Sequence, residues 1–298
     1  MSVRVTVPAT SANLGPGFDC LGLALGLRDE LEGELTDTGI GVDVVGEGAG
    51  SVPLDETHLV LRAMRLAFDA LGERPSGLRL SCRNAIPHAR GLGSSSAAIV
   101  GGLVLARALV VSGPERLSDD DLLALAVDQE GHPDNVAPAL HGGFVLSGTD
   151  ERGELYAVGS PVDPQVSAVV FLPPEPLSTE VARGLLPASV PHADAAADAG
   201  AAALLVAALA GRTDQLWRAT RDRLHQEYRR PAMPASLDLV DRLRADGHAA
   251  VVSGAGPTVL VLVAGEDGAG ADLAAYAPDG WRHLRLPVSA DGARVEPS

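Results

Sequence analysis

The segment from Asn84 to Ala97 constrains this chain more than any other, because glycines and serines there lead directly into an apolar run. It reads Asn84-Ala-Ile-Pro-His-Ala-Arg-Gly-Leu-Gly-Ser-Ser-Ser-Ala97, and residues 97–111 are almost wholly apolar. An alternating segment just upstream, residues 78–82, is typical of a strand. The expected order is therefore strand, loop and buried helix.

A loop of this kind predicts an anion site. Where a Gly-rich loop opens a helix, unpaired backbone N–H groups and the positive end of the helix dipole lie together. Gly91 and Gly93 permit positive φ and a close ligand approach, and the serines can donate hydroxyls. A plain turn or linker is the alternative for a lone Gly-x-Gly. No Gly-Lys-Ser/Thr follows, and the Gly-x-Gly-x-x-Gly spacing fails at Ser96, so neither Walker A nor a dinucleotide fingerprint is present.

Composition limits the partners of the chain. Its 298 residues suit two domains or one large one, and with 46% hydrophobic but only 3% aromatic residues the core must be aliphatic. A formal net charge of −16 argues against a nucleic-acid partner. The two cysteines, Cys20 and Cys82, lack Cys-x-x-Cys spacing and are typical of a reducing compartment.

The N-terminus indicates no secretion signal. It lacks an apolar h-region, and the long apolar run near residue 100 is interrupted by Arg107 and too short to span a bilayer. We therefore expect a soluble, cytoplasmic protein with neither a membrane nor a nucleic-acid partner.

A second demanding loop follows an expected strand at residues 3–7, which Pro8 is predicted to end. It reads Pro8-Ala-Thr-Ser-Ala-Asn-Leu-Gly-Pro-Gly-Phe-Asp19, with several positions that need special backbone geometry. Asn13 and Asp19 are its strongest polar side chains. They can grip a ligand or form local Asx-turns, and the pattern leaves both possibilities open.

A polar cluster lies at Asp128-Gln-Glu-Gly-His-Pro-Asp-Asn-Val-Ala-Pro138. His132 suggests a metal, but no second His or Cys stands at ligand spacing, which argues against zinc. Mg²⁺ is typically held by one or two carboxylates together with nucleotide phosphates. Glu130 is the preferred carboxylate for such a site.

Strands alternate with helices in the second half, which predicts an α+β fold with a ferredoxin-like sandwich. A further glycine-rich turn, Ser253-Gly-Ala-Gly-Pro-Thr258, serves as a hairpin turn, although its residues exceed what a turn needs. The expected strands are residues 166–172, 249–253, 259–263 and 282–288, and the last of them is predicted to end the ordered chain. The expected helices are residues 195–210, 214–228 and 236–246, with a short one around Asp272.

Together the three loops resemble, in order and spacing, the three motifs of the GHMP kinase superfamily. The residues of the first loop and of Glu130–Pro138 are similar to those of the homoserine kinase branch. The Gly-Glu-His motif of galactokinases and mevalonate kinases is absent. The resemblance implies an α+β, two-domain fold. Residues 1–160 would form an N-terminal domain like ribosomal protein S5 domain 2, and residues 161–298 a ferredoxin-like C-terminal domain.

The same resemblance implies an activity. It is the ATP-dependent phosphorylation of the L-homoserine hydroxyl to O-phospho-L-homoserine in threonine biosynthesis, with Mg²⁺ and in a homodimer. A GHMP kinase for another small alcohol or amino acid is the alternative within the superfamily. A non-catalytic nucleotide-binding relative is the alternative outside catalysis.

The resemblance also implies residue roles. Asn135 and Glu130 would be catalytic, and Glu130 and Ser94 would hold Mg²⁺, with no dedicated general base. His58 stands where relatives often have Asn near the adenine. The nucleotide-binding set is His58, Pro87, Arg90, Gly91, Leu92, Gly93, Ser94, Ser95, Ser96 and Ala97. The substrate-binding set is Asn13, Asp19, His132, Asn135, Arg183, Arg229, Gly254 and Gly256.

Overall fold

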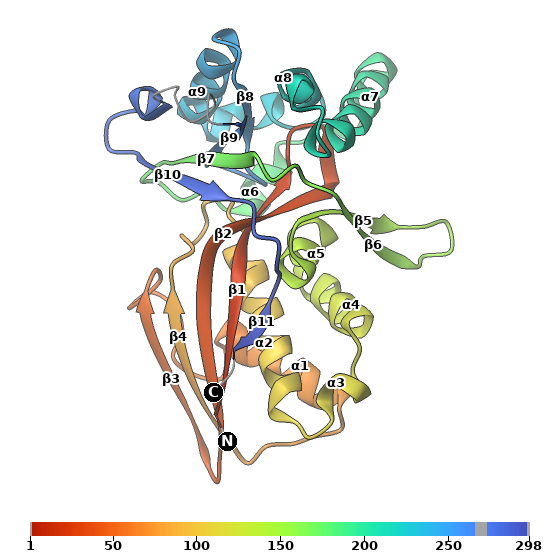
Figure 1. Ribbon diagram of the computed structural model, residues 1–298. Helices are drawn as coiled ribbons and strands as arrows, with labels where there is room; N and C mark the ends of the chain where they lie inside the picture. Colours follow the sequence, from red (N-terminus) through yellow and green to blue (C-terminus); the bar gives the residue numbers. More distant parts are fainter. Residues whose placement is uncertain (1, 266–272, 297–298) are drawn as a thin grey trace.

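A long antiparallel hairpin, β1 (Ser2–Asn13) and β2 (Gly17–Thr36), runs the length of the molecule in Figure 1. The computed structural model describes residues 2–265 and 273–296. Strand β1 continues past Pro8, where the sequence predicted a loop. The pairing with β2 shifts register between Pro8 and Ala9, and proline is tolerated at such an irregularity. The first glycine-rich loop is therefore the tip of a hairpin.

Around this hairpin a seven-stranded sheet forms in the order β11-β1-β2-β4-β3, with β5 on the far part of β2 and β6 beyond β5. Among residues 2–265 and 273–296, β3 and β4 are the one parallel pair. Figure 1 shows the helices of this half gathered on one side of the sheet. The remaining strands are β3 (Gly39–Gly46), β4 (Gly77–Asn84), β5 (Phe144–Thr149), β6 (Leu155–Ser160) and β11 (Arg294–Glu296), and the helices are α1 (Leu59–Ala70), α2 (Ser94–Leu109), α3 (Gly113–Arg116), α4 (Asp119–Glu130) and α5 (Pro133–His141).

Helix α2 is the buried centre of this half, as the apolar run predicted. Its residues Ala97, Ile99 and Leu103 are at most 1% exposed. A Cβ at Gly102 would stand 2.5 Å from the carbonyl oxygen of Val60, so α1 packs backbone to backbone against α2 there. This close packing fixes the axis of α2, and with it the place where its N-terminus emerges.

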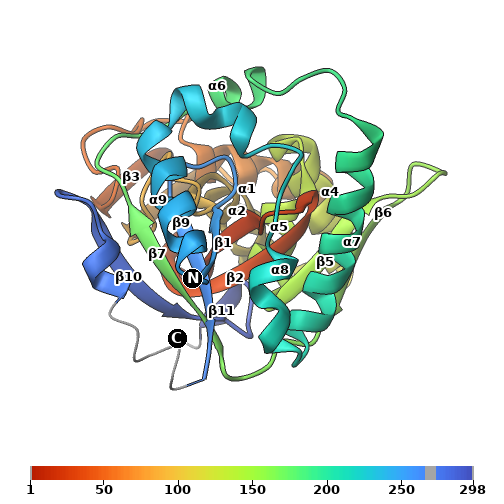
Figure 2. The same cartoon turned by 90° about the horizontal axis from the view of Figure 1, so that it is seen from above.

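The second half contains a four-stranded antiparallel sheet in the order β10-β7-β9-β8, the ferredoxin-like order that the sequence predicted. Seen from above in Figure 2, α7 and α8 lie to one side of this sheet and α9 crosses it. Its strands are β7 (Val166–Leu172), β8 (Ala249–Val252), β9 (Val259–Ala264) and β10 (Arg282–Pro287). Its helices are α6 (Thr179–Gly184), α7 (His192–Leu209), α8 (Leu216–Ala219) and α9 (Pro234–Ala245), with 3-10 turns η1 (Thr213–Gln215), η2 (Glu227–Ala232) and η3 (Leu273–Tyr276).

The helix predicted over residues 214–228 is wrong. The chain forms η1 and the single turn of α8, and then an irregular segment leads to η2. The cause is Asp222, whose carboxylate accepts hydrogen bonds from the backbone N–H groups of Leu224, His225 and Gln226. Such local side-chain acceptors compete with helical bonding.

The C-terminal end of the chain also differs from the prediction. One more strand, β11, follows the predicted last strand and pairs with β1, with Val295 opposite Val5. Asp272, where a short helix was expected, lies outside the described residues, and η3 begins at Leu273. We retain the division near residue 160 as a proposal, with β11 returning to the first sheet.

Helix α7 is long and apolar enough to cross a membrane by length and composition alone. Its two carboxylates tie it to the rest of the chain instead. Asp198 accepts the Arg223 backbone N–H at 2.8 Å, and Asp194 accepts the Arg223 guanidinium at 2.9 Å. These bonds attach α7 to the segment after α8, and one such helix is weak evidence for a membrane span.

Asp29 of β2 anchors the start of the glycine-rich segment. One carboxylate oxygen, Oδ1, accepts the backbone N–H groups of Ala85 at 2.7 Å and Ile86 at 2.9 Å. Burial raises the pKa of this carboxyl to about 6, against an ordinary value of 3.8. Between pH 4 and 6 the native state therefore binds more protons than the unfolded state, and the contribution of Asp29 to stability is lost as the pH rises through 6.

We predict that Asp29→Asn removes this pH dependence, because the amide keeps the Oδ1 acceptor and cannot ionise. We compare the free energy of unfolding of the variant with that of the unmodified chain. The difference, variant minus unmodified, should rise by up to about 3 kcal/mol between pH 4 and 7. Urea unfolding at both pH values measures it. Asp43→Asn, an exposed carboxylate on β3, is the matched control. Equal pH slopes for both variants would contradict the prediction.

Candidate active site

Three glycine-containing loops, distant in sequence, are joined by backbone hydrogen bonds where the two sheets meet. Thr10 N–H donates to the carbonyl of Leu92 at 3.0 Å, and Gly254 N–H donates to that of Ala12 at 3.0 Å. The Ser253 hydroxyl donates to the carbonyl of Gly91 at 2.6 Å. The three segments singled out in the sequence therefore form one continuous wall.

The N-terminus of α2 opens into this junction. Gly93 is its N-cap residue with φ of 70°, and no side chain caps the helix. The first intrahelical bond is Ala97 N–H to the carbonyl of Gly93, so the N–H groups of Ser94, Ser95 and Ser96 have no helical acceptor. The geometry is that of a helix N-terminus suited to bind an anion.

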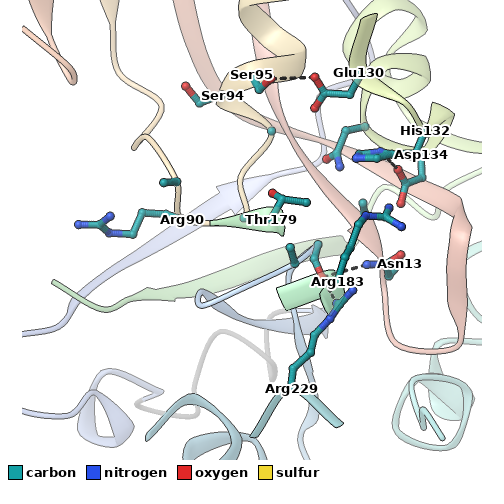
Figure 3. A pocket seen from close by; sticks show the side chains of 17 residues that line it. Asn13, Arg90, Ser94, Ser95, Glu130, His132, Asp134, Thr179, Arg183 and Arg229 are labelled. Atoms are coloured by element: carbon teal, nitrogen blue, oxygen red, sulfur yellow. Dashed lines mark hydrogen bonds and ion pairs between the residues drawn. The ribbon is translucent and has the colours of Figure 1, made fainter. Parts of the chain in front are cut away.

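Glu130, the last residue of α4, faces this helix start (Figure 3). Its two carboxylate oxygens accept the hydroxyls of Ser95 at 2.7 Å and Ser96 at 2.9 Å. Ser94 lines the same pocket, although it makes no bond to Glu130 in the described residues. Ser95 and Ser96, neighbours in the first turn of α2, thus share one carboxylate. Hard oxygen ligands are therefore concentrated at the start of this helix.

Asn135, in the first turn of α5, is oriented by Thr10. The Thr10 hydroxyl donates to Asn135 Oδ1 at 2.8 Å, which leaves the Nδ2 amino group to face the pocket that Asn135 lines. Thr10 is fully buried, and its place in the first loop is the one feature of the sequence that indicates it. Asn135 therefore presents a hydrogen-bond donor of fixed direction.

His132 and Asp134 form a pair beside Asn135, with 2.7 Å between Nδ1 and Oδ1 (Figure 3). Burial lowers the pKa of the imidazole, but the hydrogen bond and charge of Asp134, with the charge of Glu130, outweigh this and raise it above 6.5. The pair adds a polar wall to the pocket. The sequence places Asp134 in the polar cluster without predicting a role for it.

An arginine pair forms the opposite wall. Arg183 of α6 binds Asp19 through both terminal nitrogens, at 2.5 and 3.0 Å, in a bidentate ion pair. Arg229 of η2 is 1% exposed and lines the pocket as well. Asn13 uses its amide internally, accepting Asp19 N–H and donating to the carbonyl of Gly254, both at 2.9 Å. Positive and negative groups thus alternate along this wall.

Two cavities meet at the serine loop. The first, of about 90 Å³, has charged side chains in its lining, which Figure 3 shows. The second, of about 290 Å³, lies between α1, β4 and α2 and is more apolar. Ala89, Ser94 and Ser95 line both. One elongated site therefore has an apolar compartment and a charged compartment, with the α2 N-terminus between them.

The structure brings most of the predicted residues to these cavities. Twelve line the charged compartment: Asn13, Arg90, Gly91, Gly93, Ser94, Ser95, Glu130, His132, Asn135, Arg183, Arg229 and Gly254. His58 and Ala97 line the apolar one. Five predicted residues line neither compartment and lie behind the lining: Asp19, Pro87, Leu92, Ser96 and Gly256.

Some of these residues are engaged with the protein itself. The Arg90 guanidinium donates to the carbonyls of His88, Pro173 and Pro174, which ties the loop to the second half. His58 caps α1 by accepting Val60 N–H at its Nδ1, at 3.3 Å. Burial, with the nearby His88, lowers the pKa of His58.

Several lining residues escaped the sequence reasoning. Thr179 opens α6 and lines the charged compartment, and no sequence pattern predicts it there. Ala12, Ala89 and Ala255 contribute little besides backbone, and no side-chain chemistry could indicate them. Proximity to the three glycine-rich loops was the one usable signal.

Comparisons with known proteins agree with this geometry. The family models described as "GHMP kinases N terminal domain" and "GHMP kinases C terminal" match residues 58–143 and 201–281. The homoserine kinase of Streptomyces avermitilis is 57% identical over 297 residues, covering 99% of this chain and 96% of that protein. The homoserine kinase of Streptomyces coelicolor is 56% identical, covering 99% and 95%.

A solved structure is similar over the same length. The crystal structure of homoserine kinase from Cytophaga hutchinsonii superposes with a TM-score of 0.87 at 29% identity, covering 99% of this chain and 97% of that one. The similarity therefore extends over both halves and over all three loops.

We predict that Gly93→Ala damages the loop junction. A Cβ there would lie 1.9 Å from the Thr10 hydroxyl, at a φ that favours glycine. The variant should lose about 1 to 3 kcal/mol in free energy of unfolding, as strain and a displaced side chain predict. Gly41→Ala, in open space on β3, is the control for replacing glycine. Equal denaturation midpoints for the two variants would refute the assigned role of Gly93.

Proposed function

The chain belongs to the homoserine kinase family of the GHMP kinase superfamily, and from this premise we propose how its residues carry out the reaction. The enzyme transfers the γ-phosphoryl group of ATP to the side-chain hydroxyl of L-homoserine, a step in threonine biosynthesis. The observation that carries the residue assignment is the single elongated site at the α2 N-terminus.

We assign ATP to the apolar compartment and the serine loop. An adenine ring suits the cavity beside His58, and the phosphates suit the free N–H groups of Ser94, Ser95 and Ser96. Arg90 supports the loop rather than the phosphates, since three carbonyls occupy its guanidinium. The fold thus replaces the lysine of a P-loop with backbone amides and a helix dipole.

We further propose that Mg²⁺ binds with ATP at Glu130. Its carboxylate and the hydroxyls around it, Ser95, Ser96 and the adjacent Ser94, are the hard oxygen ligands that Mg²⁺ prefers. Within residues 2–265 and 273–296 no three His, Cys, Asp or Glu side chains gather as a metal site, which fits an ion held mainly by phosphates. When bound, Mg²⁺ supplies charge neutralisation on the phosphates.

L-Homoserine then occupies the charged compartment. As a zwitterion it needs an acceptor for its ammonium and cations for its carboxylate. Arg183 and Arg229 line the compartment as the cations, and Asp19, the predicted acceptor, lies behind the lining and is paired with Arg183. Asn13 and Gly254 hold this end of the site in shape. The substrate hydroxyl would then lie toward Asn135 and His132, near the α2 N-terminus.

The proposed mechanism relies on alignment. A loose phosphoryl-transfer transition state asks mainly for positioning and for stabilisation of spread negative charge. Asn135 Nδ2 would donate to the reacting oxygens, and the amides of the serine loop would hold the phosphate. Glu130 and Asp134, the lining carboxylates, are already hydrogen bonded to serines and to His132. We therefore assign no dedicated general base.

We also propose a homodimer acting in the cytoplasm, as the resemblance to the family implies. Light scattering should give twice the chain mass of 30.5 kDa.

The function is tested by ADP release with L-homoserine, mevalonate and galactose in turn. We expect turnover with homoserine alone and a phosphate ester at its side-chain hydroxyl by ³¹P NMR. Turnover only with a non-amino-acid would indicate another GHMP kinase, and ATP binding without turnover would indicate a non-catalytic relative.

We predict that Thr10→Val lowers kcat by about 10- to 100-fold, because Asn135 loses the donor that fixes its amide. Thr10→Ser keeps the hydroxyl and should retain most of the activity. Steady-state kinetics with homoserine measures both variants. If valine and serine give the same kcat, or if Asn135→Ala keeps full kcat, the assigned role of Asn135 is wrong.

We predict that Glu130→Gln raises the Mg²⁺ concentration needed for half-maximal activity by about 10-fold or more, since a carboxylate charge is lost. Asp128→Asn, on the same helix but exposed, is the matched control. Titration of Mg²⁺ at fixed ATP measures the effect. An unchanged Mg²⁺ requirement in the Gln variant would remove Glu130 from the metal site.

A further inference from the structure

His225 is a buried histidine outside the residues assigned so far, and each of its ring nitrogens has a polar neighbour. Nδ1 lies 3.0 Å from Nη1 of Arg229, and Nε2 lies 2.7 Å from the carbonyl oxygen of Gly15. Arginine only donates and a carbonyl only accepts, so these partners determine the tautomer. Nε2 carries the proton, and Nδ1 offers its lone pair to Arg229.

The surroundings keep this ring neutral and fixed. Burial lowers the pKa of His225, which leaves the Nδ1 lone pair available. The Asp222 carboxylate holds the turn that carries the ring by accepting the N–H groups of His225 and Gln226, and its Oδ1 lies 3.5 Å from Nε2. The turn held by Asp222 therefore positions the imidazole on one side, and the tip of the β1–β2 hairpin positions it on the other.

Through this ring the guanidinium of Arg229 has one orientation. Its Nη1 donates to His225 and to the carbonyl of Gly254 at 3.0 Å, and its Nε donates to the carbonyl of Ala182 at 3.3 Å. In the described part of the chain no acceptor bonds Nη2, and Arg229 lines the charged compartment. Burial lowers the pKa of Arg229 to about 10, so the group remains a cation at neutral pH.

Phe18 completes the arrangement. Its ring lies 5.3 Å from that of His225, and the guanidinium carbons of Arg183 and Arg229 lie 5.5 and 5.6 Å from its centre. The two like charges would repel each other, and an aromatic face between them offsets part of that cost. Phe18 and His225 thus hold two arginines on the same wall of the site.

We propose that His225 is a positioning residue that directs the free Nη2 edge of Arg229 toward the substrate carboxylate. This rests on the proposed function, because it needs a carboxylate substrate in the charged compartment. His225 touches no reacting atom and acts through Arg229. It also ties the first loop, through Gly15, to the arginine, so that the loop carrying Asp19 and the η2 arginine are set relative to each other by one ring.

Two amide variants separate this role from plain core packing. In His225→Asn, Oδ1 can lie where Nδ1 of the histidine lies and accept from Arg229. In His225→Gln, the amide reaches the place of Nε2 and leaves Nη1 of Arg229 without its side-chain acceptor. We expect the Gln variant to raise the KM for homoserine by about 10- to 100-fold, as a misplaced binding group does. We expect the Asn variant to stay within about fivefold, and the KM for ATP to change less than twofold in both.

A cycle with Arg229→Lys tests whether the effect passes through the arginine. In the Arg229→Lys background, His225→Gln should change the KM for homoserine less than threefold. The effects of two substitutions at residues in direct contact are not additive. Equal KM increases for Asn and Gln, parallel increases for ATP, or full additivity with Arg229→Lys would each overturn the inference. Failure of the unmodified enzyme to phosphorylate homoserine would instead overturn the proposed function.

Discussion

Backbone hydrogen bonds among three glycine-containing loops are the constraint on which the site depends. The carbonyls of Ala12, Gly91 and Leu92 accept donors from partner loops, and no side chain could be inserted between them. A Cβ at Gly91 would stand 2.3 Å from the Ser253 carbonyl oxygen. The approach of the two halves is therefore set by main-chain contacts, and the side chains of the site take their positions from these contacts.

This constraint explains why the side chains assigned to the site come from the ends of helices and from loops. Glu130 ends α4, Asn135 lies in the first turn of α5, and Arg183 lies in the last turn of α6. Residues near one end of each helix line the cavity. Residues at these helix ends could be exchanged for others without disturbing the core. The same fold could therefore accept alcohols of different shape.

Local patterns and motif spacing predicted the loops and the α+β class, and the resemblance to the GHMP kinases implied most of the lining residues. None of these predicted the ends of elements governed by tertiary bonds. Asp222 breaks an otherwise helical segment by accepting three backbone N–H groups. The pairing of Thr10 with Asn135 joins residues 125 positions apart, and no local pattern contains such a distance. The hydroxyls that bond Glu130 are those of Ser95 and Ser96, since helix geometry decides which hydroxyls reach it, and the metal role of Ser94 stays a prediction.

A chain with a net charge of −16 that binds a polyphosphate must concentrate positive potential locally. At physiological ionic strength the Debye length is about 8 Å, so surface carboxylates farther away are largely screened. The amides of Ser94–Ser96, the α2 dipole and the arginines of the charged compartment lie within the cavity walls, where screening is weak. Asp19 then compensates Arg183 inside the same wall, and a zwitterion can approach without a net electrostatic penalty. On the proposed assignment, the ion pair rather than the overall charge would match the site to an amino-acid substrate.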